Sequence, residues 1–392
     1  MVDSANRTKE VREYYFSSKL STIRDMIAGG LDVINMGIGS PDILPPPEVI
    51  EALTSTCNKA GAHGYQPYKG VDELRAAISL WYHLHYGVKP DPASQVLPLI
   101  GSKEGIMHIS LAYLNSRDAV LVPDPGYPAY STAAGICGAR CIYYDLNKSN
   151  NWMPDIQNIE KADLRGVKLM WVNYPNMPTG VRGTTELFRE LVSFARKHNI
   201  LVVNDNPYSF IINNKPLSIL RADSSFENVL ELNSLSKSHN MAGWRMGMAI
   251  GHEKHINNIL KIKSNMDSGM FLPIQQAAIK ALNIGQEWYE RLNSIYYSRQ
   301  QLVYDLLNRL ACLTRDDQSG LFLWSRIPDR FTDSYKFSDY CLNKYHLFIT
   351  PGLVFGLNGR RYVRTSLCLK ESRIKEAIER VKHINYARQT GS

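Results

Sequence analysis

The sequence predicts an α/β protein with a mostly parallel central sheet in a large domain and a smaller α/β domain beside it. Three observations support this fold class: a length of 392 residues, an alternation of short apolar strands and amphipathic helices from about residue 95 to 250, and a change of pattern beyond about residue 290. We therefore expect 1–40 to be an N-terminal segment of the small domain, 41–290 the large domain and 291–392 the small C-terminal domain.

The composition indicates a soluble globular protein, with 44% hydrophobic and 21% charged residues. No stretch approaches the roughly 18 apolar residues that cross a bilayer, and the charged start MVDSANRTKEVREYYF has no apolar signal-peptide core. Of the six cysteines, only Cys137 and Cys141 are close, and no second pair completes a zinc site. We expect a cytoplasmic protein with reduced thiols, no metal and no contact with membranes.

Basic residues exceed acidic ones by 45 minus 37, which gives a net charge of +8. The chain has no cluster of five or more lysines and arginines, so nucleic acid is not the expected partner. A diffuse positive charge suits small anionic ligands at least as well.

The first elements follow from spacing and from glycines. A helix is expected within the first 30 residues, where apolar side chains recur at helical spacing until a glycine pair stops the pattern: Val11, Tyr14, Tyr15, Leu20, Ile23 and Met26. The segment LDVINMGIGSPD (31–42) then predicts a short strand that runs into a Gly/Pro loop.

The repeated part predicts six strands with helices between them. The strand segments are QVLPLIG, AVLVP, CIYYDL, KLMWVNYP, ILVVNDNP and VLELNSLS. The helical segments are SKEGIMHISLAYL, AYSTAAGICGA and TELFRELVSFARKHN. Such an alternation indicates a doubly wound sheet, whose ligands bind beyond the carboxyl ends of the strands. Beyond residue 290, a long helix, the strands GLFLWSRI, LFITPG and YVRTSLCL, and the last helix KESRIKEAIERVKHI predict the small domain.

Two segments contain groups that bind phosphate. PLIGSKEG (98–105) predicts a strand, a glycine turn and a helix start, which directs the backbone N–H groups of Ser102 and Lys103 toward an anion. SLSKSHNMAGWRMG (234–247) adds the hydroxyls of Ser234 and Ser236 and the guanidinium of Arg245. Each feature also has an ordinary interpretation, because serines cap helices and arginines form surface ion pairs.

Lys237 lies between an apolar strand and a glycine bend, where burial would make its amine a nucleophile for carbonyl groups. Pyridoxal 5′-phosphate has both an aldehyde for an amine and a phosphate for the donors above. Its ring nitrogen needs a buried carboxylate, and VVNDNPY supplies Asp205 at a strand end with Tyr208 three residues later. The alternative for Asp205 is a helix cap.

These motifs together resemble the fold type I, class I/II aminotransferases over nearly the whole chain, from INMGIGSPD to the final helix. The matching segments are GYQPYKGVDELRAAI, NYPNMPTG, DNPY, SLSKSHNMAGWRMG and YVRTSL. In motif the chain is most similar to the LL-diaminopimelate aminotransferase-like group, with PGYPAY and DSGMFLPIQ as further matches.

The resemblance implies a role for each matched residue. Lys237 would form the aldimine with the cofactor and move the proton of the substrate Cα, Asp205 would pair with the ring nitrogen, and Tyr208 would bind the ring oxygen. The other cofactor contacts implied are Ser102, Lys103, Tyr127, Ser234, Ser236 and Arg245, with Tyr65 reaching the phosphate of a second subunit in a homodimer. The substrate carboxylate would bind Arg364 beside the backbone of Gly39.

One position departs from the family pattern. Met177 stands where the family has asparagine before Pro-Thr-Gly, and a thioether cannot donate a hydrogen bond to the ring oxygen. Either Asn176 binds the cofactor in its place or Tyr208 acts alone.

The function implied is ping-pong transfer of the α-amino group of an L-amino acid to a 2-oxo acid, either 2-oxoglutarate or pyruvate. Two alternatives stay open: a carbon–sulfur β-lyase on the same fold, and a non-catalytic regulator of that fold. The regulator is disfavoured by the intact Lys237. The motifs do not identify the physiological donor and acceptor.

Overall fold

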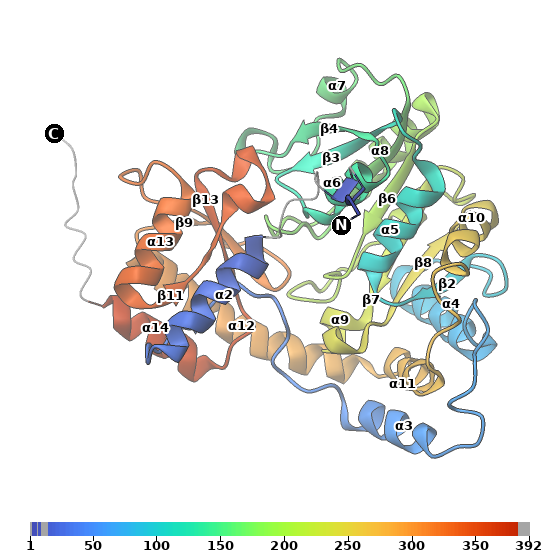
Figure 1. Cartoon of the computed structure of the whole chain (residues 1–392), viewed down its shortest axis with the longest axis horizontal. Helices are drawn as coiled ribbons and strands as arrows, with labels where there is room; N and C mark the ends of the chain where they lie inside the picture. The colour runs from blue at the N-terminus through green and yellow to red at the C-terminus, as the bar shows by residue number, and fades with distance from the viewer. Residues whose placement is uncertain (1, 6, 9–14, 383–392) are drawn as a thin grey trace.

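The structure, a computed structural model, describes residues 2–5, 7–8 and 15–382. Its largest element is a seven-stranded sheet in the order β2-β8-β7-β6-β5-β3-β4 (Figure 1). The strands are β2 (Val96–Leu99), β3 (Ala119–Asp124), β4 (Arg140–Asp145), β5 (Val167–Val172), β6 (Leu201–Asp205), β7 (Val229–Ser234) and β8 (Gly247–Gly251). Only β8 runs antiparallel to its neighbours within this sheet. The mostly parallel α/β fold expected from the sequence is therefore confirmed.

Alternate residues of the strands face two separate apolar cores. In β6, Leu201 and Val203 belong to one core and Val202 to the other. The first core is completed by α5 (Ser102–Tyr113), α6 (Ala129–Ile136) and α10 (Glu253–Lys263), and the second by α4 (Asp72–Tyr86), α8 (Thr185–His198) and α11 (Leu272–Leu282). Because helices cover both faces, the central strands are largely apolar, with buried polar exceptions such as Glu231 in β7. The short helices α3 (Pro47–Cys57) and α7 (Ile156–Ile159) pack against α11 and α8.

A second, antiparallel sheet has the order β12-β13-β10-β9. Its strands are β9 (Leu313–Thr314), β10 (Phe322–Arg326), β12 (Thr350–Pro351) and β13 (Tyr362–Ser366), accompanied by α13 (Ser334–Tyr345) and α14 (Glu371–Val381). We call this sheet with its helices the small unit. It corresponds to the strands expected beyond residue 290.

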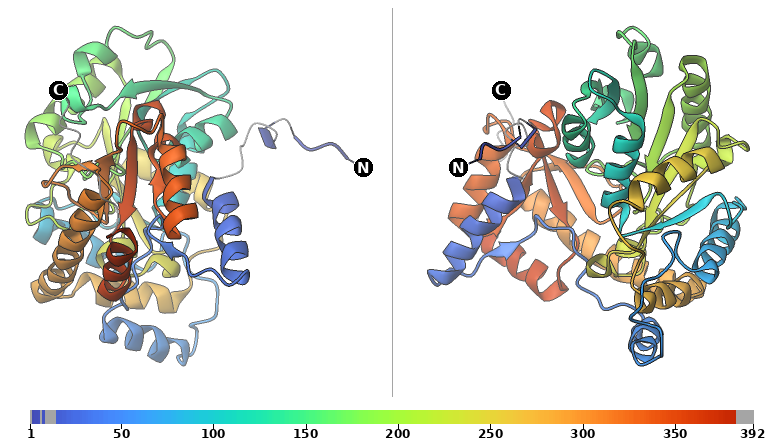
Figure 2. Two further views of the ribbon diagram at one scale, coloured as in Figure 1. Left: turned by 90° about the vertical axis from the view of Figure 1, so that its left-hand side faces the viewer. Right: turned by 45° about the vertical axis from the view of Figure 1, so that its right-hand side comes forward.

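The N-terminal segment joins the small unit. Helix α2 (Tyr15–Ala28) lies against α13 (Figure 2), where Lys19 and Asp339 form an ion pair at 2.9 Å. Strand β1 (Ile34–Asn35) pairs in parallel with β11 (Leu347–Phe348). Val11 and Tyr14 of the expected first helix, and the end of the expected last helix beyond residue 382, lie outside the described residues.

Helix α12 (Gln286–Arg309) connects the two parts of the molecule. Near its start, Trp288 Nε1 donates to the carbonyl oxygen of Ser238 at 2.8 Å, and near its end, Tyr304 Oη donates to the carbonyl oxygen of Arg315 at 2.9 Å. The boundary predicted between residues 290 and 291 falls inside this continuous helix. Among the helices of the described ranges, none is long and apolar enough to span a membrane.

Candidate active site

A cavity of about 600 Å³ opens at the carboxyl ends of the large sheet, where the small unit faces it. Its walls come from the ends of β5, β6 and β7, from the start of α5, and from the N-terminal segment and the small unit. Eleven of the predicted site residues line it: Gly39, Ser102, Lys103, Tyr127, Asp205, Tyr208, Ser234, Ser236, Lys237, Arg245 and Arg364. Residues more than 300 positions apart thus meet in one place.

The start of α5 and Arg245 form one end of the cavity. Gly101 precedes the helix with φ 82°, and a Cβ at this position would lie 2.2 Å from Arg245 Nη2. Only glycine therefore lets the guanidinium approach the helix start. The N–H groups of Ser102 and Lys103 belong to the first turn of α5, where the helix dipole favours an anion.

Two buried serines lie beside this end. Ser234 Oγ is 2.7 Å from Ser236 Oγ and 3.0 Å from the carbonyl oxygen of Met246, and it accepts the backbone N–H of Ser236 at 3.1 Å. It therefore acts as the N-cap of the one-turn helix α9 (Leu235–Ser238). Ser234 therefore both caps α9 and lines the cavity.

Lys237 projects from α9 into the cavity, where its Nζ donates to the carbonyl oxygen of Gly39 at 2.7 Å. Burial is the largest cause that lowers the pKa of this amine, and the guanidinium groups of Arg364 and Arg245 lower it further. A lowered pKa gives the neutral, nucleophilic form at a lower pH than an exposed lysine has.

Asp205 ends β6 and is 4% exposed. Its Oδ2 accepts a hydrogen bond from Tyr130 Oη at 3.0 Å, whereas its Oδ1 has no hydrogen-bond partner. Burial raises the pKa of this carboxyl to about 7, with a smaller contribution from nearby Glu231. A buried carboxylate oxygen that lacks a partner favours a cationic or N–H donor in the cavity.

Arg364, on β13, lies between two phenyl rings. Its guanidinium carbon is 3.9 Å from the centroid of Phe322 and 4.7 Å from that of Phe355. Its Nη2 donates to the carbonyl oxygen of Gly37 at 2.8 Å, and its Nη1 lies 3.2 Å from Met177 Sδ. The two rings hold the planar group in a fixed orientation, which suits bidentate binding of a carboxylate.

Two predicted residues lie outside the cavity lining. The Oδ1 of Asn176 accepts hydrogen bonds from the backbone N–H and the hydroxyl of Thr179 at 3.2 and 2.7 Å. Asn176 does not line the cavity, so the structure gives no support to the prediction that it binds the cofactor. Tyr65 is 93% exposed and does not reach the cavity of its own chain.

Among the lining residues that sequence reasoning missed, Tyr130 and Asn173 both hydrogen-bond to Asp205. The side-chain amide of Asn173 donates to the carbonyl oxygen of Asp205, and its Oδ1 accepts the N–H of Met177 at 2.7 Å. Asn173 directly follows the buried strand β5, and this position in the sequence could have indicated it as a site residue. Tyr130 gave no such signal, since an aromatic residue in an apolar helix predicts core packing.

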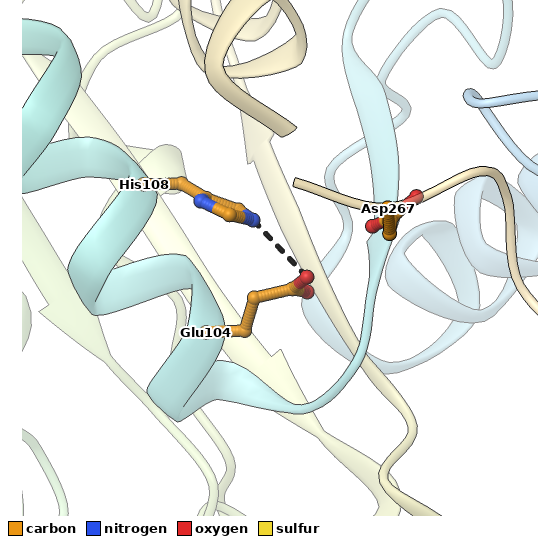
Figure 3. A group of neighbouring side chains, drawn as sticks. All are labelled: Glu104, His108 and Asp267. Carbon is orange, nitrogen blue, oxygen red and sulfur yellow. Dashed lines mark ion pairs between the residues drawn. The ribbon is translucent and has the colours of Figure 1, made fainter. Parts of the chain in front are cut away.

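A charged cluster adjoins the start of α5 (Figure 3). Glu104 Oε1 lies 3.0 Å from His108 Nε2, and Glu104 Oε2 accepts the backbone N–H of Ile100 at 2.5 Å. Asp267 lies in the loop after α10, and its carboxylate comes within 4.8 Å of the Glu104 carboxylate and the His108 ring nitrogen. The same carboxylate forms an ion pair at 2.7 Å with the buried ammonium of Lys263. Because this lysine already supplies a cation, we interpret the cluster as an anchor of the turn that precedes Ser102.

A model of the family described as aminotransferase class I and II matches residues 31–381. The chain belongs to this family. The aminotransferase is 37% identical over 379 residues to LL-diaminopimelate aminotransferase of Dehalococcoides mccartyi, covering 96% of this chain and 97% of the relative. It is 36% identical over 386 residues to the enzyme of the same name from Aquifex aeolicus, with 98% and 100% coverage.

Solved structures give the same result. The substrate-bound structure of BacF from Bacillus subtilis matches with a TM-score of 0.95 at 34% identity and covers 98% of both chains. Thermus thermophilus aspartate aminotransferase matches in fold, with a TM-score of 0.91 at 22% identity. Enzymes of the family depend on pyridoxal 5′-phosphate, so this chain is a pyridoxal-phosphate-dependent aminotransferase.

The residues of the cavity fit this cofactor. The unpartnered Oδ1 of Asp205 matches a protonated ring nitrogen. The approach of Arg245 to the start of α5, which a Cβ on Gly101 would block, matches a phosphate. The buried amine of Lys237 matches an aldehyde.

Proposed function

We propose that Lys237, Asp205 and Arg364 carry the transfer of an α-amino group from an L-amino acid to a 2-oxo acid, with 2-oxoglutarate or pyruvate as acceptor. The single observation that supports this most is the meeting of a buried amine, a buried carboxylate with one open oxygen, and an arginine held between two rings in one cavity. Bound pyridoxal 5′-phosphate supplies a conjugated, protonated ring that accepts the electrons left when the substrate Cα loses its proton.

The role that we propose for each residue follows from the environment of its side chain. Arg364 holds the substrate carboxylate and so fixes the direction of the Cα–H bond. Lys237 Nζ, whose pKa burial lowers, takes the proton from Cα and returns it to the cofactor side. Asp205 keeps the ring nitrogen protonated, and Tyr208 binds the ring oxygen.

The remaining groups hold the cofactor. The helix start at Ser102 and Lys103, the hydroxyls of Ser234 and Ser236 and the guanidinium of Arg245 would bind the phosphate, and Tyr127 would stack on the ring. We assign no cofactor contact to Asn176. Met177 lines the cavity but has no hydrogen-bond donor in its side chain, and both polar atoms of the Asn173 amide are hydrogen-bonded to backbone groups. Tyr208 is therefore the donor to the ring oxygen.

We further propose that the enzyme is a cytoplasmic homodimer. Tyr65 is 93% exposed and outside the cavity of its own chain, as expected for a residue that completes the cavity of a second copy. All six cysteines are unpaired, which suits a reducing compartment.

The test is chemical labelling combined with turnover. Borohydride treatment of the yellow holoenzyme should attach the cofactor to the peptide that contains Lys237, and Lys237→Ala should keep the fold but lose nearly all turnover. Lys254→Ala, on the exposed face of α10, is the matched control. Keto acid release that does not depend on an added 2-oxo acid would favour a lyase instead, and labelling at another lysine would remove the basis of the proposal.

A further inference from the structure

One buried arginine of α12 joins two segments of the chain that also contribute to the cavity. Arg299 is 5% exposed and does not itself line the cavity. Its Nη1 and Nη2 donate to the two carboxylate oxygens of Asp42 at 2.6 and 2.9 Å, and Nη1 also donates to the carbonyl oxygen of Leu367 at 3.2 Å. The planar guanidinium therefore fixes both the separation and the angle between the N-terminal segment and the chain that leaves β13.

Each of these two contacts lies close in sequence to a polar group of the proposed site. Asp42 comes three residues after Gly39, whose carbonyl oxygen accepts from Lys237 Nζ at 2.7 Å. Leu367 comes three residues after Arg364, the proposed ligand of the substrate carboxylate. Three residues span at most about 10 Å of chain, so a change at the arginine of α12 is transmitted to both groups over a short path.

The same helix also holds the segment that carries Lys237. Trp288 Nε1 donates to the carbonyl oxygen of Ser238, the residue after Lys237, at 2.8 Å. Helix α12 runs from the region of α9 to the small unit (Figure 1). Trp288 and Arg299 are eleven positions apart on this helix, or about 16 Å at 1.5 Å per residue. One rigid element therefore sets the distance between the amine and the side of the cavity that contains Arg364.

We propose, resting on the proposed function, that Arg299 and Asp42 are positioning residues for the substrate carboxylate. Neither side chain lines the cavity, and both act through Arg364 and the carbonyl group of Gly39. A substrate must place its carboxylate on Arg364 and its Cα beside Lys237 at the same time, which requires a fixed separation of these two groups. The ion pair on α12 supplies that fixed separation.

Arg299→Lys tests this role, because it keeps the positive charge and loses the two parallel hydrogen bonds to Asp42. We expect KM to rise about 10-fold for both the amino acid and the 2-oxo acid, since both bind through an α-carboxylate. Cofactor affinity should stay unchanged, because the proposed phosphate ligands come from segments around the large sheet. Arg309→Lys is the matched control, since Arg309 lies on the same helix with its side chain 43% exposed and pairs with Asp305 at 2.9 Å. This control should leave KM and cofactor affinity at the wild-type values.

A binding measurement without turnover separates positioning from a general loss of structure. Titration calorimetry of the holoenzyme compares 3-methylbutanoate with 3-methylbutanamide, which has the same shape and no charge. The wild type should bind the carboxylate more tightly, and Arg299→Lys should reduce the ratio of the two affinities about 10-fold. A general disturbance of the fold would instead weaken the binding of both ligands alike.

Asp42→Asn should lower the same ratio, and the double variant should lower it no further than the stronger single variant, because both substitutions break one contact. An unchanged ratio in folded Arg299→Lys or folded Asp42→Asn would overturn the inference and leave the proposed function standing. If thermal unfolding shows that neither variant folds, the pair serves folding alone and the inference is equally overturned. A wild type that binds the amide as tightly as the carboxylate would contradict the role of Arg364 in the proposed function itself.

Discussion

Replacing Asp205 by asparagine should change how the stability of the cofactor-free protein depends on pH. Burial raises the pKa of this carboxyl in the folded state to about 7, whereas an unfolded chain has about 3.9. The folded state therefore keeps a proton that the unfolded state releases between about pH 4 and pH 7. The free energy of unfolding falls as the pH rises through this window and is flat above it.

The size of the effect follows from the shift of about 3 pKa units, each worth about 1.4 kcal/mol, which gives at most about 4 kcal/mol. Asparagine has no proton to release, so Asp205→Asn should match the wild type near pH 4 and exceed its stability by up to that amount at pH 8. Glu231, whose pKa burial also raises to about 7, adds a fall of its own in both proteins, and its charge is one cause of the raised pKa of Asp205.

Urea unfolding of the cofactor-free proteins between pH 5 and 8, followed by fluorescence, measures this difference. Tyr130→Phe is the informative control, because it removes the hydrogen bond that lowers the pKa of Asp205 and should extend the fall to higher pH. With saturating cofactor the order should reverse at pH 8, since only the wild type offers a carboxylate to the ring nitrogen. Identical pH slopes for the wild type and Asp205→Asn would refute the assignment of a neutralised carboxyl.

Three further predictions concern residues around the cavity. Arg364→Ala should lower kcat/KM by at least about 100-fold with near-normal cofactor content, because each charge-assisted hydrogen bond contributes about 1.5–3 kcal/mol; loss of cofactor would place Arg364 elsewhere. Mixing Tyr65→Phe and Lys237→Ala proteins should give hybrid dimers whose activity exceeds the sum of the parents, and no recovery after proven subunit exchange would contradict the shared site. Met177→Asn should lower the pKa read from the absorbance band of the bound cofactor by about one unit, because a donor to the ring oxygen favours its ionised form. Asn176→Ala should leave that band unmoved, and a shift there would mean that Asn176 does reach the cofactor.

The strand ends were the most predictable part of the site. Asp205 and Lys237 lie at or just beyond the ends of two largely apolar strand segments, and the carboxyl ends of neighbouring parallel strands meet at the same edge of the sheet. Strand β8 was not among the six expected strands, and its antiparallel direction was not predictable, because its segment MAIG is as apolar as a parallel strand and only its neighbours set its direction. The continuity of helix α12 was not predictable either. The helix contacts both parts of the molecule, and its sequence pattern shows no break at the predicted domain boundary.

Contacts between side chains from distant segments were the least predictable. Tyr130 is fully buried and stacked on Trp171 at 5.0 Å between centroids, and nothing in its own segment indicates that its hydroxyl meets Asp205, 75 residues away. Asn176 and Asn173 are three residues apart in one loop, and only the backbone path decides which amide faces the cavity. The backbone of this loop turns the Asn176 side chain toward Thr179.

Two carbonyl groups of the N-terminal segment accept hydrogen bonds from residues of the proposed site. The oxygen of Gly39 accepts from Lys237 Nζ at 2.7 Å, and that of Gly37 accepts from Arg364 Nη2 at 2.8 Å, so one short segment orients both the amine and the guanidinium. Glycine is required at both positions, since a Cβ at Gly39 would lie 2.0 Å from the ring of Phe322 and one at Gly37 would lie 2.3 Å from another ring. The pairing of β1 with β11 fixes this segment to the small unit. A movement of the small unit relative to the large sheet would therefore shift Arg364 and the acceptor of Lys237 together, which couples carboxylate binding to the position of the amine.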